Sequence, residues 1–298
     1  MKEALVKSSI AGLMSEAKML SALEDEVIYG MKVQVLEKVV PGWYRVRTHY
    51  RYEALISEAD LLFDEEKIKQ WEQAKRAVVL HTYADVLTEN RVQGAIKISL
   101  PRGAQVILLD DTAEDGWTQV GLVDGQSGYI KSSFLGELKP SMYVDEFIDY
   151  KKGLADKSRI TQFINEKYGL NEDEFRQKVV NSALSYLGTQ YRWGGKTSLG
   201  IDCSGLVSMA YMLNGVDIYR DAKIKEGFPV HEIKLEEKKP GDLLFFPGHV
   251  AMYIGNDRYV HSTARKGSDG VVINSLNKEH DDYREDLLNN LSAVGSIF

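Results

Sequence analysis

The only cysteine of the chain, Cys203, is the residue with the clearest capacity for covalent chemistry. It follows a glycine-rich turn at 193–196 and precedes an apolar run, 206–213, that predicts a helix. A thiol at the start of a helix can be a nucleophile, because the partial positive charge of the helix N-terminus lowers the thiol pKa. A lone cysteine can equally be a buried core residue. The stretch alone leaves both interpretations open.

Two of the six histidines fall in one predicted hairpin downstream of the cysteine. His249 begins a predicted strand, 249–254, and His261 lies on the returning strand, 259–263. Side chains alternate across a strand, so the connection decides whether the imidazoles meet. A two-residue loop puts them on opposite faces, whereas a three-residue loop or a bulge puts both on one face. We predict an odd-length loop or a bulge.

A thiol, a histidine base and a polar group that orients this base are the minimum for nucleophilic acyl transfer. In this hypothesis Cys203 attacks a carbonyl carbon and His249 moves the thiol proton to the leaving amine, while His261 fixes the tautomer of His249. The oxyanion would lie near the N–H of Cys203. The three side chains are also a possible zinc set with Asp242 or water, but no short-range ligand pair accompanies them. We predict no metal and no cofactor.

The composition is typical of a soluble globular protein, with 44% hydrophobic and 27% charged residues among 298. A net charge of -7 without a basic run argues against nucleic acid and anionic membranes as partners. No segment approaches the ~20 apolar residues that span a bilayer, and no signal peptide is visible. We therefore expect a cytoplasmic monomer, or an extracellular or wall-associated protein if a leader has been removed.

The elements that must position these residues differ along the chain. The first 140 residues predict β-strands with a degenerate repeat, which fits two small all-β barrels in tandem, 1–68 and 69–140. We expect Trp43 and Trp117 to pack in the barrel cores. The matching segments are 33–36 with 104–109, 42–46 with 116–120 and 53–56 with 127–130.

A connector, 141–172, follows, with a predicted helix over 160–168. Asn171 is expected to cap the next helix, 172–187, which Gly188 ends. From 173 to 298 the pattern is mixed α and β and contains the cysteine and the histidine hairpin.

A set of motifs in this last region occurs in one order and resembles the NlpC-type cell-wall endopeptidases, which are bacterial cysteine peptidases with a papain-like fold. The resemblance covers about residues 175–298 and puts the family's nucleophile, base and orienting residue on Cys203, His249 and His261. The motifs are Tyr191-x-Trp193-Gly194-Gly195, Asp202-Cys203-Ser204-Gly205-Leu206-Val207, Pro240-Gly241-Asp242-Leu243-Leu244-Phe245-Phe246, Gly248-His249-Val250-Ala251-Met252-Tyr253-Ile254-Gly255 and Tyr259-Val260-His261-Ser262.

The whole chain is similar to a subgroup with two N-terminal SH3-like domains. This resemblance implies a multidomain fold, with two all-β SH3-like barrels followed by an α+β papain-like cysteine peptidase domain. It implies hydrolysis of the γ-D-glutamyl-L-diamino acid bond of murein peptides that begin with a free L-alanine, in cell-wall turnover or recycling. Asp202, Ser204 and Tyr191 are then expected to contact the substrate.

The same resemblance assigns Glu16 and Tyr52 of the first barrel to substrate binding. The chain departs from the pattern at both places: Ala17 replaces a proline, and 52–55 lacks a glycine and a tryptophan. Their alternative roles are a surface charge and a barrel aromatic. Two carboxylates around one ammonium would select free N-termini and so released peptides. Another amidase or transacylase on the same triad, or an inactive peptidoglycan-binding protein, stays open.

Overall fold

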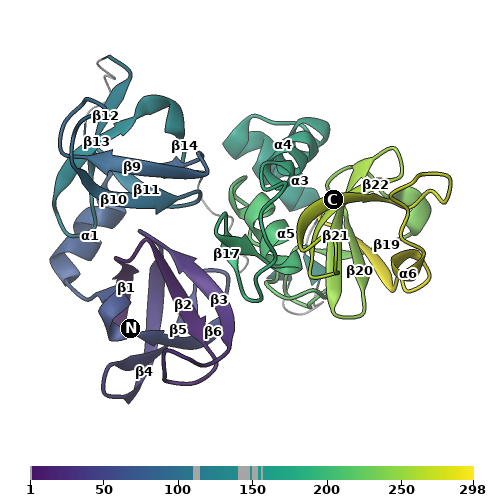
Figure 1. Cartoon of the computed structure of the whole chain (residues 1–298), viewed down its shortest axis with the longest axis horizontal. Helices are drawn as coiled ribbons and strands as arrows, with labels where there is room; N and C mark the ends of the chain where they lie inside the picture. The colour runs from purple at the N-terminus through teal and green to yellow at the C-terminus, as the bar shows by residue number, and fades with distance from the viewer. Residues whose placement is uncertain (1, 110–114, 140–147, 150–153, 156) are drawn as a thin grey trace. The chain divides into compact units, whose positions relative to one another are not determined.

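The computed structural model describes residues 2–109, 115–139, 148–149, 154–155 and 157–298 (Figure 1). The chain divides into two compact units, Met1–Leu138 and Lys139–Phe298. The predicted boundaries at 68 and 172 stay predictions. Within the described residues, no helix is long and apolar enough to cross a membrane.

The first unit begins with a seven-stranded antiparallel barrel whose strands follow the order β3-β2-β6-β5-β4-β1-β7. A short 3-10 helix, Glu58–Asp60, precedes its last strand. Alternation along the strands turns apolar side chains such as Leu5, Val46 and Ile56 into the core. The strands are β1 Lys2–Val6, β2 Ile10–Met14, β3 Leu23–Ile28, β4 Lys32–Val40, β5 Trp43–Thr48, β6 Glu53–Ser57 and β7 Leu61–Leu62.

A second barrel repeats this arrangement in the order β10-β9-β13-β12-β11-β8-β14, which is the first order with each number raised by seven. A 3-10 helix, Ser132–Phe134, again precedes the last strand. The predicted pair of SH3-like barrels is confirmed. The strands are β8 Arg76–Val79, β9 Tyr83–Leu87, β10 Ile96–Pro101, β11 Gln105–Leu108, β12 Trp117–Gly121, β13 Ser127–Lys131 and β14 Leu135–Glu137.

The tryptophan prediction is right for one barrel and wrong for the other. Trp117 is buried, whereas Trp43 is partly exposed. Strand β5 buries Tyr44 and Val46, so alternation turns Trp43 to the outer face. The fully buried tryptophan is Trp71.

Trp71 lies on helix α1, Glu65–Gln73, which joins the barrels and packs between them. Its indole N–H donates to the carbonyl of Gly30 at 3.1 Å. A Cβ at Gly30 would lie 2.6 Å from the Trp71 ring, and φ is +80° there, so this site requires glycine. Tyr29 accepts at its hydroxyl from the N–H of Val123, and at its carbonyl from that of Gln105. The two barrels therefore form one unit.

The second unit is an α+β domain with a six-stranded antiparallel sheet, in the order β19-β24-β20-β21-β22-β23. The predicted cap at Asn171 is confirmed as a capping box with Glu174. The helices are α3 Lys157–Tyr168, α4 Glu172–Leu184, α5 Cys203–Met212 and α6 Glu285–Leu288. The strands are β15 Ile148–Asp149, β16 Leu154–Ala155, β17 Lys196–Thr197, β18 Gly200–Ile201, β19 His231–Ile233, β20 Leu243–Phe246, β21 His249–Gly255, β22 Arg258–Thr263, β23 Gly270–Ser275 and β24 Ala293–Ser296.

Helix α5 is the central helix of this domain. It packs against α4 on one side and against β21 and β22 on the other (Figure 1). Every residue from Cys203 to Tyr211 is buried. The helix begins at the cysteine itself, three residues before the predicted run, so its first turn lies next to the histidine strands.

Candidate active site

Cys203 occupies the first position of α5, and Asp202 caps the helix. The Asp202 carboxylate accepts a hydrogen bond from the N–H of Gly205 at 2.6 Å. A Cβ at Gly205 would lie 2.2 Å from the carbonyl of Gly195, so the glycine-rich turn packs directly on the helix start. The close approach of Gly195 and Gly205, which a larger side chain would prevent, thus fixes the backbone around the thiol.

The hairpin of β21 and β22 brings the two histidines together. Asn256 and Asp257 form a two-residue turn with positive φ angles of 51° and 57°. The register shifts between Tyr253 and the end of β21, which is a bulge. As a result Nε2 of His249 lies 2.7 Å from Nδ1 of His261. The predicted bulge is confirmed.

Two contacts bring this hairpin to the nucleophile. The hydroxyl of Ser262, next to His261, donates to the carbonyl of Ile201 at 2.6 Å. The backbone N–H of Val250, the residue after His249, donates to the thiol sulfur of Cys203. The predicted nucleophile, base and orienting residue therefore lie in one site.

The histidine pair continues into an amide that the sequence analysis missed. Nε2 of His261 lies 2.9 Å from Oδ1 of Asn274, on the neighbouring strand β23. The side-chain amide of Asn274 donates to the backbone carbonyl of Asp282 at 2.8 Å. Val272 pairs with His261, so two residues further on, Asn274 shares its face of the sheet. Alternation along β23 could have identified Asn274 only if the register between β22 and β23 had been known.

Both imidazoles are neutral at neutral pH. Burial, together with a smaller effect of the neighbouring His261, lowers the pKa of His249 to about 3. Burial also lowers the pKa of His261 to about 4, against the opposing effect of its Asn274 hydrogen bond. Each ring therefore carries one proton.

The thiol is neutral as well, and the expectation of a lowered pKa is wrong for the free site. Burial, together with a smaller effect of the Asp202 carboxylate, raises the pKa of Cys203 to about 11. The N–H of Val250 opposes this shift only in part. The physical reason is first the burial of the thiol, which disfavours the charged thiolate, and then the capping carboxylate, which offsets the positive end of the helix. The proton must therefore leave the sulfur during attack.

Asp202 is the centre of a buried charged cluster on the other side of the thiol. Besides the Gly205 N–H, its carboxylate accepts from the N–H of Gly194 at 2.8 Å. Two nitrogens of Arg220, a residue that is 2% exposed, bind its two oxygens at 3.0 Å each. Arg220 also donates to the hydroxyl of Ser204 at 2.7 Å. Arg220 was missed because nothing in its irregular segment marks a partner eighteen positions earlier.

Tyr191 borders the same cluster. Its segment pairs with Ile201 through an isolated bridge. Burial raises its pKa to about 12, and the nearby Cys203 and Asp202 contribute to the shift. The structure thus brings Tyr191, Asp202 and Ser204 together beside Cys203, and their role in binding stays a prediction.

Glu16 and Tyr52 belong to the first unit. Glu16 is exposed in the β2–β3 turn, where it accepts from Lys18 at 2.8 Å. The Tyr52 hydroxyl is 3.5 Å from a carboxylate oxygen of Glu24. Their role in substrate binding stays a prediction.

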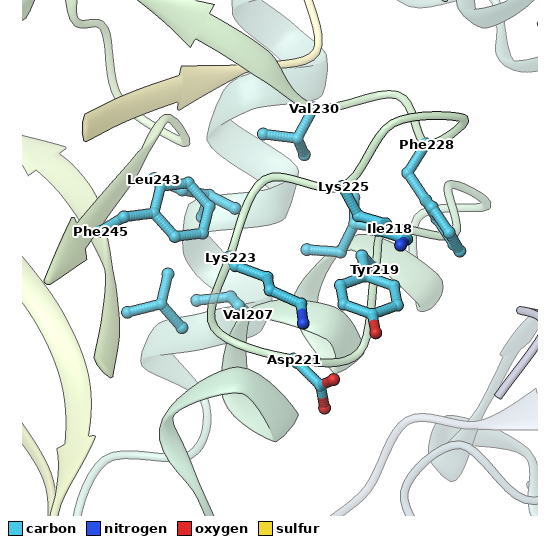
Figure 2. Close-up of a pocket in the computed structure, with 11 residues that line it drawn as sticks. Val207, Ile218, Tyr219, Asp221, Lys223, Lys225, Phe228, Val230, Leu243 and Phe245 are labelled. Carbon is cyan, nitrogen blue, oxygen red and sulfur yellow. The ribbon is translucent and has the colours of Figure 1, made fainter. Parts of the chain in front are cut away.

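A pocket with an apolar floor and three charged residues in its lining reaches Val207, one helical turn after Cys203 (Figure 2). Tyr219 and Asp221 reach it from both sides of Arg220, so this segment contributes to the pocket and to the Asp202 cluster at once. Figure 2 shows Val207, Leu243 and Phe245 grouped on one side and Tyr219 and Phe228 on the other.

Asp242, the fourth ligand of the zinc alternative, instead forms a buried ion pair with Arg176 at 2.7 Å. Among the residues that the structure describes, no three His, Cys, Asp or Glu side chains are grouped to hold a metal ion. The arrangement is suited to acyl transfer through a thiol and an imidazole.

Comparisons with known proteins identify relatives over the whole length. The model of the NlpC/P60 family matches residues 188–286. A Lysinibacillus sphaericus protein named dipeptidyl-peptidase 6 is 42% identical over 99% of both chains. A Bacillus subtilis protein named gamma-D-glutamyl-L-lysine dipeptidyl-peptidase is 33% identical over 49% of this chain and 45% of its own. The crystal structure of an NlpC/P60 family protein from Bacillus cereus covers 98% of both chains with a TM-score of 0.72 and 19% identity, a likeness of fold.

Proposed function

The chain belongs to the NlpC/P60 family of peptidoglycan peptidases, and from this premise we propose that it is a cysteine endopeptidase. Its substrates are murein peptides with a free N-terminal L-alanine, and the bond cut joins γ-D-glutamate to the L-diamino acid. The observation that carries the proposal is that Cys203, at the start of α5, accepts at its sulfur from the N–H of Val250, the residue after His249, while His249 is hydrogen-bonded to His261.

In the proposed reaction the sulfur of Cys203 attacks the γ-carbonyl carbon of D-glutamate. Because sulfur and imidazole are both neutral, the thiol proton moves to Nδ1 of His249 as the carbon–sulfur bond forms. The oxyanion accepts from the N–H of Cys203, which has no acceptor within the helix. His249 then protonates the leaving amine, and water attacks the thioester to release the peptide and restore the thiol.

Binding of a free N-terminal amine requires negative charge in the site that is not already compensated. Arg220 already compensates the charge of Asp202, so the pair alone offers an ammonium little net attraction. A second carboxylate is needed, and Glu16 is the residue that the family resemblance assigns. Tyr191, Ser204 and Tyr52 complete the proposed binding set. The proposal also comprises a monomer in the cytoplasm that trims released peptides.

Mass spectrometry of the products tests this proposal. We expect the purified protein to convert L-Ala-γ-D-Glu-diamino acid into L-Ala-D-Glu and the free diamino acid. The N-acetylated twin of this peptide should remain intact, because its terminal nitrogen carries no charge. Equal cleavage of both peptides would remove the free-amine requirement. Cleavage at another amide would favour a different amidase.

A further inference from the structure

A row of hydrogen bonds runs from the catalytic imidazole to a backbone carbonyl. It joins His249 Nε2 to His261 Nδ1 at 2.7 Å, and His261 Nε2 to Asn274 Oδ1 at 2.9 Å. The row ends where Asn274 Nδ2 meets the carbonyl oxygen of Asp282 at 2.8 Å. Its members come from β21, β22, β23 and the segment before α6.

The last acceptor determines the direction of every proton in the row. A backbone carbonyl only accepts, so the Asn274 amide must present its NH₂ to Asp282 and its oxygen to His261. That oxygen also only accepts, so the proton of His261 is on Nε2. The bare Nδ1 of His261 then accepts from Nε2–H of His249. Nδ1 of His249 is left without a proton.

We propose that Asn274 is a positioning residue that holds His249, through His261, in the tautomer whose bare Nδ1 receives the thiol proton. The proposal rests on the proposed cysteine peptidase activity and adds a residue to its machinery. Without Asn274, His261 can carry its proton on Nδ1 and donate to His249. That exchange would put the proton of His249 on Nδ1, where no base would remain for Cys203.

The charges around the pair do not replace this function. Arg284, which precedes α6, and Asp286 of α6 affect the pKa of both imidazoles in opposite directions. They bind each other through two hydrogen bonds of 2.7 and 2.6 Å, so their effects largely cancel. Tyr259 contacts His261 edge-on, with ring centroids 5.2 Å apart, and offers no directed proton. Asn274 is therefore the group that orients the pair.

The test compares Asn274→Leu, which keeps a similar volume without an acceptor, with Asn274→Asp, which keeps the oxygen. Ser275→Ala is a matched control, because Ser275 neighbours Asn274 on β23 but binds Asp257 and His280 instead. For the leucine variant we expect kcat to fall about 10- to 100-fold with KM unchanged. The aspartate variant should regain most of kcat, with the acid limb of its pH profile moved to higher pH.

Histidine ¹⁵N NMR provides the readout that a purely structural role would not change. The wild-type protein should show His249 and His261 each with a protonated Nε2 and a bare Nδ1. The leucine variant should show Nδ1 protonation of at least one ring, and Ser275→Ala should resemble the wild type. Wild-type tautomers or a kcat within twofold in Asn274→Leu would overturn the proposal. If that variant does not fold, an unshifted pH profile of Asn274→Asp would overturn it.

These results are separable from failure of the proposed function. If wild-type protein cleaves no murein peptide, the NMR tautomers still report the direction of the row. Unprotonated Nδ1 nitrogens on both rings would then support the positioning role of Asn274 in an acyl transfer on a different substrate. A proton on Nδ1 of His249 in the wild type would contradict it whatever the substrate.

Discussion

On one side of Cys203 lie two neutral imidazoles and an amide, and on the other lie a buried carboxylate and a buried guanidinium. The neutral side is joined by directed hydrogen bonds from Asn274 to His249. The charged side is a paired salt bridge between Asp202 and Arg220. A neutral row can pass on a proton without first losing a charge partner, whereas a buried salt bridge fixes the geometry of the binding residues around it. The two sides therefore suit proton transfer and binding respectively.

The largest expected effect is on the neutral side. Cys203→Ala and His249→Ala should each lower kcat by about 10⁴-fold or more, because each removes an atom of the reacting unit. The charged side is intact in both, so calorimetry should find wild-type affinity for the tripeptide. Loss of binding together with turnover would break the division between the two sides. Retained turnover in Cys203→Ala would remove the nucleophile assignment.

On the charged side the next largest effect concerns stability. Arg220→Met leaves Asp202 buried without its partner, and we expect a loss of about 3–5 kcal/mol in the free energy of unfolding. Urea unfolding followed by circular dichroism measures it. Arg265→Met is a control, since Arg265 is 53% exposed and 3.7 Å from Asp286, and should cost under about 1 kcal/mol. Equal losses would mean that the Asp202 pair is no more important than a surface contact.

The third prediction concerns acid. The folded-state pKa values of about 3 for His249 and about 4 for His261 lie below the ordinary 6.5, so the unfolded chain binds more protons between these values. The stability that comes from the two neutral rings is complete above pH 6.5 and is lost as the pH falls toward 4, by about 3 kcal/mol for each ring.

Urea unfolding at pH 7 and pH 4.5 tests the acid prediction. His261→Gln should lose less stability between the two than the wild type, because one buried titrating ring is gone. His81→Gln, which changes an exposed histidine of the second barrel, is the control and should behave as the wild type. Identical losses in His261→Gln and the wild type would show that other groups cause the acid sensitivity.

The smallest expected effect is that of Glu16, the proposed second carboxylate. Glu16→Gln should raise KM for the free tripeptide up to about tenfold with kcat unchanged, because one charge-assisted hydrogen bond is weakened. Glu89 is a matched control: it lies in the corresponding β9–β10 turn and pairs with Arg91 at 2.8 Å, as Glu16 pairs with Lys18. If Glu89→Gln has the same effect, the charge of the surface and not a specific contact is responsible.

The alternation and repeat of residues in the sequence were sufficient to predict the hairpin bulge and the two barrels. The bulge followed from the need to bring His249 and His261 to one face, and the barrels followed from the repeat around Gly-Trp pairs. Trp43 was mispredicted because its strand buries the other face. Arg220 and Asn274 were missed because both act through tertiary contacts with Asp202 and His261. The thiol pKa was mispredicted because the burial of Cys203 and the charge of the capping Asp202 together outweigh the effect of the helix start.

The contact of Trp71 with Gly30 has a consequence for how the N-terminal unit can change. The identical strand orders are consistent with duplication of one ancestral module. Domains of this kind can normally be gained or lost one at a time during evolution. Here the linker helix contributes Trp71 to the packing against the first barrel, so truncation after residue 68 would remove the buried indole and leave the carbonyl of Gly30 without its donor. The two barrels and the helix between them are therefore expected to be gained or lost together.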